Sequence, residues 1–383
     1  MHEEPIQIEV IDDLARFKAL RDEWNPLLQS SCADGIYLTY EYQITWWEHY
    51  GDRFKLRILV ARRGQQLLGI APLAIGPGNG LIRGRMRYLT FIGVLGDTAA
   101  DFLDFIIAPG TEQEVVPKFY ETIYEELGRQ WDVLFLNLTP AQSPVLSRAL
   151  PVISQFKGLA VTINSSPSPF LPLPDSWSEL LSAKSKNFKK QFNNHWNRLH
   201  KNHTVEVLRP GVDLDFDEAF AVLVELNRKR WGKEGQAFRS KRFNRFHREL
   251  AERFDELGWL YFRVVKVDGE VAAARFDYVY NDKLWNVQGG WNPKLSHLSL
   301  GRILIGIQIK WCIEQGLKEY DFLAGDSGYK RSWATDSRDL VNVEVLNSSS
   351  WRALAYHEFR IVKNLLDPRR RPKPIQQDAV CHT

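Results

Sequence analysis

One segment sets the architecture of this chain: Tyr320-Asp321-Phe322-Leu323-Ala324-Gly325-Asp326-Ser327-Gly328-Tyr329-Lys330-Arg331-Ser332-Trp333. Its apolar start predicts a buried strand over 318–323. Gly325 and Gly328 allow the following turn to take a positive φ or to approach a ligand closely. Tyr329 and Lys330 bring a phenol and an ammonium to that turn. A predicted helix over 302–315 lies just before the strand, and together they indicate a ligand site in an α/β fold.

Length and composition limit the classes of protein to which the chain can belong. Its 383 residues exceed one ordinary core and predict two or three domains. The formal net charge of +3 neither requires nor excludes a nucleic-acid partner. Three scattered cysteines exclude a disulfide framework, and no histidine falls in a metal-ligand spacing, so we expect no metal. The N-terminus lacks an apolar signal core and no run is long enough to span a membrane, so we expect a cytoplasmic protein.

Periodicity and turn residues predict the order of the elements. Helices are expected over 12–29, 39–49, 112–128, 143–155, 176–201, 214–231, 241–257, 302–315 and 351–365. Strands are expected over 55–62, 67–75, 86–92, 102–107, 131–138, 204–209, 259–267, 270–280, 283–290, 318–323 and 341–347. The fold class is therefore α/β, with mixed sheets flanked by helices.

A segment rich in serine and proline predicts how the chain divides into domains. The segment 165–175 is rich in serine and proline and predicts a linker between a domain of residues 1–164 and a domain of residues 176–366. The basic tail 367–383 is expected to be disordered. The predicted hairpins at 56–70 and 261–274 share one layout, strand, polar turn and strand, in similar surroundings. This repetition predicts two copies of one α/β unit.

At this point the chain resembles the GNAT N-acyltransferase superfamily, in the tandem-domain branch that includes acetyltransferases associated with cellulose and exopolysaccharide biosynthesis. The resemblance rests on weak motifs in a consistent order: Trp24, 40–47, Tyr50-Gly51, 59–62, 69–73, Arg230-Trp231-Gly232, Ser299-Leu300-Gly301, 320–323, Tyr329-Lys330 and Trp333. It is more distantly similar to Fem-type aminoacyltransferases. The resemblance implies two tandem GNAT-like domains, each with a twisted mixed sheet.

The same resemblance implies a reaction. We expect transfer of an acyl group from acetyl-CoA or another acyl-CoA to an amino group of a sugar or of a cell-envelope or polysaccharide precursor. A Fem-like transferase that uses aminoacyl-tRNA is one alternative, and a non-catalytic GNAT-fold binding protein is the other. The basic residues of the predicted helix 176–201 keep a tRNA partner open, although such a charge run is usually a solvated face.

The donor loop departs from the GNAT pattern Q/R-x-x-G-x-G/A. Here it reads Ser296-His297-Leu298-Ser299-Leu300-Gly301, and only the last glycine matches. We expect Ser296, Ser299, Leu300, Gly301 and Arg302 to bind the donor, because amides at a helix start attract an anion. The alternative is that Ser299 is a simple N-cap. Gly289 and Gly290 are added to this set, since they predict a bulge or a close backbone approach in the preceding strand.

Four residues are predicted to carry the chemistry. Lys330 is expected to stabilise developing negative charge, and Tyr329 to protonate the leaving thiolate, the role a tyrosine has in many GNAT enzymes. Asp326 or Asp277 is the candidate base for the attacking amine. Each has a structural alternative: a solvated lysine, a packed tyrosine, a turn-capping Asp326, and an Asp277 paired with Arg275.

The acceptor groove is predicted to be lined by Arg230, Trp231, Trp291 and Trp333, although core packing is the alternative for the tryptophans. The first domain shows little catalytic apparatus. Asp101 and Asp104 could face the acceptor cleft, or could be polar residues at a strand end. We therefore expect this domain to be a degenerate copy that builds one wall of the acceptor site.

Overall fold

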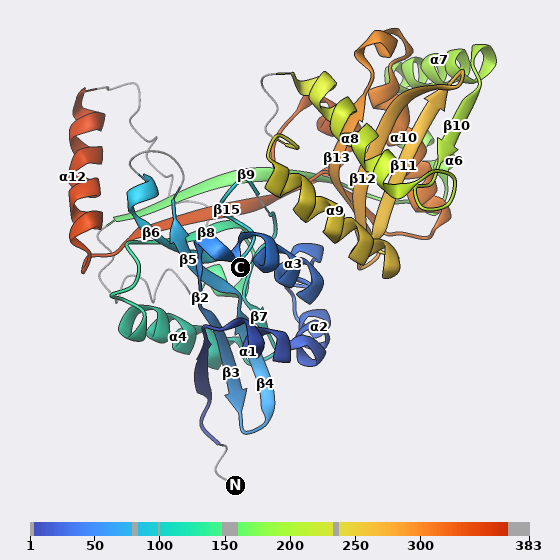
Figure 1. Cartoon of the computed structure of the whole chain (residues 1–383). Coiled ribbons are helices and arrows are strands. Elements are labelled where there is room, and N and C mark those ends of the chain that lie inside the picture. The colour runs from blue at the N-terminus through green and yellow to red at the C-terminus, as the bar shows by residue number, and fades with distance from the viewer. Residues whose placement is uncertain (1–3, 79–82, 99, 148–159, 233–236, 367–383) are drawn as a thin grey trace.

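The computed structural model describes residues 4–78, 83–98, 100–147, 160–232 and 237–366 (Figure 1). The first half of the chain contains β1 (Gln7–Ile11), α1 (Leu14–Ala19), α2 (Arg21–Ser30), α3 (Tyr40–Tyr50), β2 (Lys55–Leu56), β3 (Ile58–Arg63), β4 (Gln66–Ala71), β5 (Leu73–Pro77), β6 (Arg87–Phe91), β7 (Ile106–Ile107), α4 (Glu112–Glu121), β8 (Val133–Pro140) and β9 (Ala160–Pro172).

The second half repeats this order of strand, helices, hairpin, helix and strands. It contains α6 (Trp177–Ala183), α7 (Lys186–Asn202), β10 (Val205–Leu208), α8 (Phe216–Trp231), α9 (Lys241–Glu256), β11 (Leu260–Val267), β12 (Glu270–Tyr280), β13 (Lys283–Trp291), α10 (Leu300–Glu314), β14 (Glu319–Asp321), α11 (Gly328–Trp333), β15 (Asp336–Leu346) and α12 (Trp351–Leu366).

The pairing of the strands is nearly symmetric about the β9–β15 pair. The larger sheet has the order β10-β11-β12-β13-β14-β9-β15-β8-β6-β5-β2. On one side β9 pairs antiparallel with β14, and β14 pairs parallel with β13. On the other side β15 pairs antiparallel with β8, and β8 pairs parallel with β6. Each half therefore places its last strand beside the other half, as expected of two copies of one unit.

The two predicted hairpins also lie in matching surroundings. The β3–β4 hairpin belongs to the antiparallel order β1-β3-β4-β7, and the β11–β12 hairpin to the antiparallel order β10-β11-β12-β13. The mixed α/β fold, with two units of similar strand order, is confirmed. The bounds predicted for the two domains remain a prediction.

The predicted linker is wrong as a structural element. Residues 165–172 form the second part of β9, which pairs with β15 from Ala160 to Phe170 and with β14 from Phe170 to Pro172. Pro167 and Pro169 are two residues apart, so their missing N–H groups lie on one side of the strand and leave the other side free to pair. Their carbonyls still accept hydrogen bonds, from Gly325 N at 2.9 Å and Phe322 N at 3.0 Å.

Two further elements differ from the prediction. The helix predicted over 176–201 is divided into α6 and α7, because Ser185 caps a new helix by accepting from Phe188 N. The Tyr-Lys turn is the first turn of a short helix, α11. Most of the helix predicted over 143–155, and the whole tail 367–383, lie outside the described residues.

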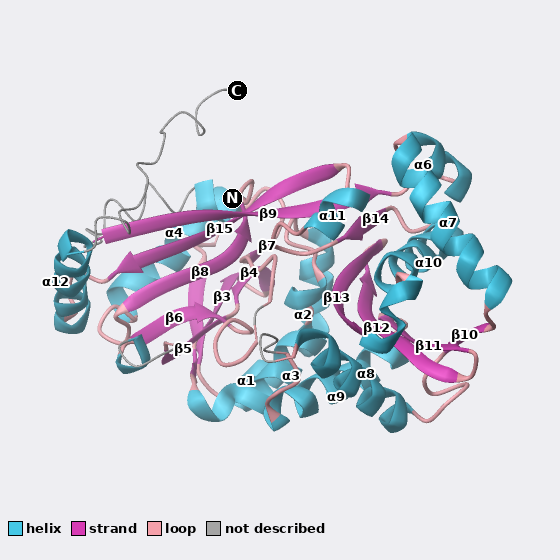
Figure 2. Ribbon diagram, turned by 90° about the horizontal axis from the view of Figure 1, so that it is seen from above, coloured by secondary structure: helices cyan, strands magenta, loops and turns pink. Residues whose placement is uncertain are grey.

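Helices α3 and α9 join the two halves on one face of the sheets (Figure 2). Arg242 forms two hydrogen bonds of 2.8 Å with the carboxylate of Asp52, and His49 lies 2.8 Å from Glu249. The halves are therefore held at both the β9–β15 pair and this helix pair. No helix in the described residues is long and apolar enough to cross a bilayer.

Candidate functional site

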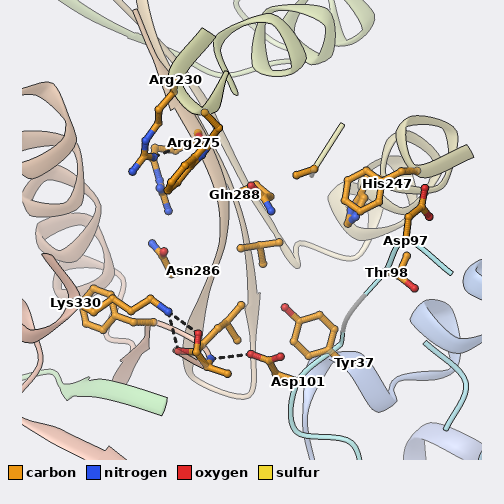
Figure 3. Close-up of a pocket in the computed structure, with 18 of the residues that line it drawn as sticks. Tyr37, Asp97, Thr98, Asp101, Arg230, His247, Arg275, Asn286, Gln288 and Lys330 are labelled. Carbon is orange, nitrogen blue, oxygen red and sulfur yellow. Dashed lines mark hydrogen bonds between the residues drawn. The ribbon is translucent and has the colours of Figure 1, made fainter. Parts of the chain in front are cut away.

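A cavity of about 370 Å³ lies where the two halves meet (Figure 3). The second half contributes residues of α8, α9, β12, β13 and α11, and the first half contributes residues of α3 and of the segments before and after it. The lining side chains with chemical functions are Tyr37, Tyr42, Asp97, Thr98, Asp101, Arg230, Trp231, His247, Arg275, Asn286, Gln288, Tyr329 and Lys330.

A second cavity of about 260 Å³ adjoins the first. It lies between the end of β13 and the start of α10, and Gly301 and Arg302 line it together with Trp291. Arg230, Arg275, Gly289 and Tyr329 line both cavities. The start of α10 and the first turn of α11 therefore open on two cavities that meet at Tyr329.

The local sheet geometry explains the smaller cavity. β13 and β14 pair in parallel over Lys283–Trp285 and Glu319–Asp321, and β13 then continues to Trp291 without β14 beside it. A gap opens where the pairing ends. This places backbone and side chains of β13 opposite α10, with Tyr329 at the same end of the gap.

A buried polar network lies behind the cavities. Arg275 forms hydrogen bonds of 2.7 to 3.0 Å with Asp277, and the Asp277 carboxylate also accepts from Gln308 Nε2 and from Val287 N. Tyr320 donates to Gln308 Oε1 and accepts from Asn286. Burial disfavours the charge of Arg275, but the Asp277 carboxylate raises the pKa of Arg275 above its ordinary value.

The structure therefore does not support the prediction that Asp277 is a catalytic base. Its side chain is fully buried, does not line either cavity, and accepts hydrogen bonds from Arg275, Gln308 and Val287. The alternative, a carboxylate paired with Arg275, is the observed one. Asp277 positions a cation between the two cavities.

The bulge predicted in β13 exists, but not at the glycines. The register with β12 shifts opposite Asp277, at Asn286 and Val287, and turns the Val287 amide toward that carboxylate. A Cβ at Gly290 would lie 2.4 Å from the backbone nitrogen of Asn227 in α8, and one at Gly289 would lie 2.7 Å from Arg275 Nη1. The glycines therefore allow the close approach of α8 and make room for Arg275.

The start of α10 matches the anion-binding prediction in part. Ser299 takes a left-handed conformation (φ 56°) and its side chain makes no capping hydrogen bond. Gly301 and Arg302 line the smaller cavity, and Arg302 Nη1 donates to Gln191 Oε1 at 2.8 Å. Ser296 is exposed, and Leu300 is buried in the core, so these two predicted donor residues do not line the cavity through their side chains.

Lys330 and Tyr329 both line the larger cavity. Lys330 Nζ donates to the carbonyls of Leu323 at 3.0 Å and Ala324 at 2.8 Å (Figure 3). Burial lowers the pKa of Lys330, and three nearby aspartates oppose that shift. Burial raises the pKa of Tyr329, against the opposing charges of Arg275 and Arg230. Tyr329 therefore keeps its proton at neutral pH.

Two carboxylates, Asp97 and Asp101, line the larger cavity, and Asp101 is the one that contacts the loop before α11. Its Oδ2 accepts from Ala324 N at 2.8 Å, which connects it to the loop that holds Lys330. Burial raises the pKa of Asp101 to about 6, although that amide and the Lys330 charge oppose the shift. His247 lines the same cavity, but burial lowers its pKa to about 3 and leaves it neutral. Asp101 is thus a candidate general base, because it lines the cavity and burial raises its pKa toward neutral pH.

The remaining predicted residues divide into two groups. Arg230 and Trp231 line the larger cavity, with the Arg230 guanidinium 4.6 Å from the Trp231 ring, and Trp291 lines the smaller cavity.

The other predicted residues lie outside these two cavities. The ring of Trp333 is buried against Phe188 and Phe192. Asp326 does not line either cavity and pairs with Arg331 at 3.1 Å, since the turn points it to solvent. Asp104 lines a separate cavity.

Sequence reasoning missed much of the larger cavity. Tyr37, Asp97, His247 and Gln288 were not singled out, because they come from distant segments and none belongs to a motif. The alternating run around Arg275 offered one usable signal, since two opposite charges within a predicted buried strand imply a paired network.

Comparison with known proteins agrees with this geometry. Residues 186–331 match the model of the family described as "Acetyltransferase (GNAT) domain". No curated protein matches the chain. The matched segment runs from α7 to α11 and includes the start of α10, Tyr329 and Lys330.

Solved structures show the same fold at low sequence identity. FemX superposes with a TM-score of 0.60 and 10% identity, over 93% of this chain and 100% of FemX. The C-terminal domain of a putative lysylphosphatidylglycerol synthetase from Agrobacterium fabrum gives 0.51 and 9%, over 90% and 97% of the two chains. L-PGS from Bacillus licheniformis gives 0.51 and 10%, over 94% and 99%. The chain therefore shares the fold of these structures over nearly its whole length, and its second half contains the segment that matches the GNAT acetyltransferase domain.

Proposed function

We propose that the protein transfers an acyl group from acyl-CoA to an amino group of a sugar or of a cell-envelope or polysaccharide precursor in the cytoplasm. The smaller cavity would hold the donor and the larger one the amine. The observation that carries this proposal is the meeting of the two cavities at Tyr329, between an uncapped helix start and a buried carboxylate.

The donor side fits an anionic thioester. Amides at the start of α10, next to the uncapped Ser299, and the Arg302 guanidinium would hold phosphate oxygens. Bound acyl-CoA supplies an activated carbonyl carbon and a thiolate leaving group. No residue of the chain needs to form a covalent bond in this reaction.

The chain's own residues would then move protons and balance charge. Asp101 accepts the proton that the attacking amine loses, and its pKa of about 6 leaves it ionised at neutral pH. Lys330 stabilises the negative charge that develops on the carbonyl oxygen as the new C–N bond forms. Tyr329 donates its proton to the departing sulfur as the C–S bond breaks.

The first test measures binding and turnover separately. Acetyl-CoA and CoA should raise the melting temperature of the full chain, and release of free CoA thiol should depend on an added amino sugar. The proposal is overturned if acetyl-CoA and CoA give no thermal shift and no amino sugar of the panel causes thiol release. A shift without turnover would favour the binding-protein alternative.

A second candidate, transfer from aminoacyl-tRNA, has one observation in its favour. The basic helix α7 lies beside the start of α10: Arg198 donates to the carbonyl of His297, and Arg302 donates to Gln191. Phosphates of a tRNA acceptor end could bind along the basic side chains of that surface. A thermal shift and transfer activity with aminoacyl-tRNA, but not with acetyl-CoA, would replace the first proposal with this one.

A further inference from the structure

His247 is a buried histidine of α9 with one ring nitrogen facing the larger cavity. The residue is 7% exposed and lines that cavity (Figure 3). Its Nδ1 lies 3.2 Å from the hydroxyl of Tyr278. Its Nε2 has no hydrogen-bond partner among the described residues and is not sealed inside the protein, so this nitrogen opens on the cavity. Because buried polar groups nearly always have a partner, Nε2 marks a position for a ligand atom.

The rest of the imidazole ring is surrounded by phenylalanines. The ring centroids of Phe243 and Phe246 lie 4.2 and 4.9 Å from that of His247. Those of Phe238 and Phe276 lie 6.0 and 6.1 Å away. Burial in these surroundings lowers the pKa of His247 to about 3, so the ring is neutral. An apolar side chain would pack here without the cost of burying a polar ring, and packing alone therefore does not explain a histidine.

The hydrogen bond with Tyr278 indicates which nitrogen of His247 carries the proton. The Tyr278 hydroxyl is fully buried, and His247 Nδ1 is its partner within the described part of the chain. A buried hydroxyl that donates to nothing is destabilising, so Tyr278 donates to Nδ1. The neutral ring then carries its proton on Nε2. His247 therefore presents an N–H donor, and no acceptor, to the cavity.

Asp97 lies at the same end of the cavity as His247 (Figure 3). Its Oδ1 accepts from the Tyr50 hydroxyl at 2.5 Å, which orients the carboxylate and leaves Oδ2 without a partner among the residues described. The negative charge of Asp97 disfavours a ligand anion here. An ammonium group only donates hydrogen bonds, so it does not match the His247 N–H. A hydroxyl matches both residues, because its oxygen accepts from His247 while its hydrogen is donated to Asp97.

Gln288 lies between His247 and Arg275 in the cavity (Figure 3). Its Oε1 accepts from Asn227 Nδ2 at 3.1 Å, which turns the donating end of the Gln288 amide away from Asn227. Arg275 and Tyr329 line both cavities, so this side is the one that joins the smaller cavity. A ligand that extends from Tyr329 to His247 therefore meets a neutral amide on its way. Such a lining suits a ligand with several hydroxyl groups.

We propose that His247 and Asp97 bind one hydroxyl group of the acceptor and so select a polyhydroxylated amine, such as an amino sugar, over a simple alkyl amine. The His247 Nε2–H donates to the hydroxyl oxygen, and the Asp97 carboxylate accepts a hydrogen bond from the same hydroxyl. Binding at this end directs the rest of the acceptor, with its amine, toward Tyr329. His247 is thus a specificity residue and transfers no proton. This inference rests on the proposed function for the assignment of the larger cavity to the acceptor.

The test is a double-mutant cycle between His247 and the hydroxyls of the ligand, measured as dissociation constants by isothermal titration calorimetry of the full chain. The probes are glucosamine, galactosamine and mannosamine, and then the 3-, 4- and 6-deoxy analogues of the one that binds best. One deoxy analogue should bind the wild type about tenfold more weakly, and His247→Leu should weaken binding of the parent sugar by a similar factor. That analogue should bind both proteins equally, because the same hydrogen bond is already lost.

Further variants separate this contact from packing. His247→Gln keeps an N–H donor near the Nε2 position and should bind the parent sugar within about threefold of the wild type. Asp97→Ala changes an exposed residue and should remove the dependence on the same hydroxyl, so it provides the cycle if the melting temperature shows that His247→Leu is unfolded. The matched control is His203→Leu, which removes a histidine that pairs with Asp268 outside both cavities and should bind every probe as the wild type does.

The outcomes distinguish this inference from the acyl transfer on which it rests. An equal weakening of the parent sugar and of every deoxy analogue by His247→Leu would overturn it, and so would the absence of binding of all three amino sugars. The predicted cycle without release of CoA thiol from acetyl-CoA would support the hydroxyl site and overturn the acyl transfer. Thiol release with a failed cycle would support the acyl transfer and overturn the hydroxyl site.

Discussion

The two halves of the molecule share one order of strands but differ at the start of their corresponding helices. The first turn of α4 carries Glu112 and Glu114, whereas the first turn of α10 carries Gly301 and Arg302. Acidic residues at a helix start interact with the helix dipole themselves and would repel a second anion. The same structural position is therefore suited to an anionic ligand in one half and occupied by the chain's own charges in the other.

The buried residues of the two halves also differ in polarity. The β3–β4 hairpin of the first half buries Leu59, Val60, Ile70 and Ala71, and α4 buries Val115, Val116 and Phe119. The corresponding β12 of the second half buries Arg275 and Asp277, which Gln308 of α10 supports. A buried ion pair seldom adds stability over apolar packing. Among the described residues, the β3–β4 hairpin has no counterpart of this network, which indicates a functional constraint on β12.

The first half nevertheless supplies one functional group. Asp101 lies in a segment of the first half and reaches the loop that Lys330 holds. Under the proposed function, the second half binds the donor and the first half forms one wall of the acceptor cavity. The predictions below test that division.

The largest effect is expected from Asp101→Asn. Loss of the base should lower kcat and kcat/KM by about 10²- to 10⁴-fold. In the wild type, kcat/KM should fall as pH decreases through about 6, because the base must be ionised, and the variant should lose that dependence. The matched control is Asp104→Asn, which removes a carboxylate of the same half that lies outside the site. Equal activity of Asp101→Asn and the control would contradict the assignment.

The second prediction makes β12 resemble the apolar first half. Arg275→Met leaves Asp277 buried without its partner and should lower the free energy of unfolding by about 3–5 kcal/mol. Adding Asp277→Leu should recover much of the lost free energy of unfolding, because both buried charges are then removed. Denaturant titration measures the stability of each variant. Activity should stay low in the double variant because Arg275 lines both cavities; restored activity would show that the network serves packing alone.

The third prediction concerns Lys330. Lys330→Met keeps the length of the side chain but removes its charge, and should lower kcat and kcat/KM together by about 100-fold. A change confined to the KM of the donor would assign Lys330 to ground-state binding. Because Nζ also holds the carbonyls of Leu323 and Ala324, the melting temperature of the variant must be measured beside its kinetics.

The smallest effect is expected from Arg302→Glu, which gives α10 the charge found at the start of α4. The KM for acyl-CoA should rise about tenfold or more, with a smaller change in kcat, because a charged hydrogen bond contributes about 1.5–3 kcal/mol. The converse variant, Glu112→Arg, should leave both constants unchanged. An effect of Glu112→Arg on donor binding would mean that the first half also holds the donor.

Much of the fold could be predicted from sequence. Periodicity located most helices and strands, and the glycine-bearing segment with Tyr329 and Lys330 led to a candidate site in the second half. The pairing of β9 with β15 and β14 could not be predicted, because Pro167 and Pro169 make this strand resemble a linker. Asp101 was predicted only as a residue that could face the acceptor cleft, because its raised pKa depends on burial that the sequence does not show. Asp277 and Trp333 were assigned wrongly because sequence order does not show which side of a strand or helix faces a cavity.

A crystal structure of the full chain with acetyl-CoA tests the central claim most directly. We expect density for one molecule per chain, in the gap between β13 and β14, with phosphates at Ser299–Arg302 and the acetyl carbonyl toward Tyr329. The free side of the acetyl group should open on the cavity that Asp101 lines. Density at the start of α4, or an acetyl group directed away from that cavity, would contradict the division of labour between the two halves.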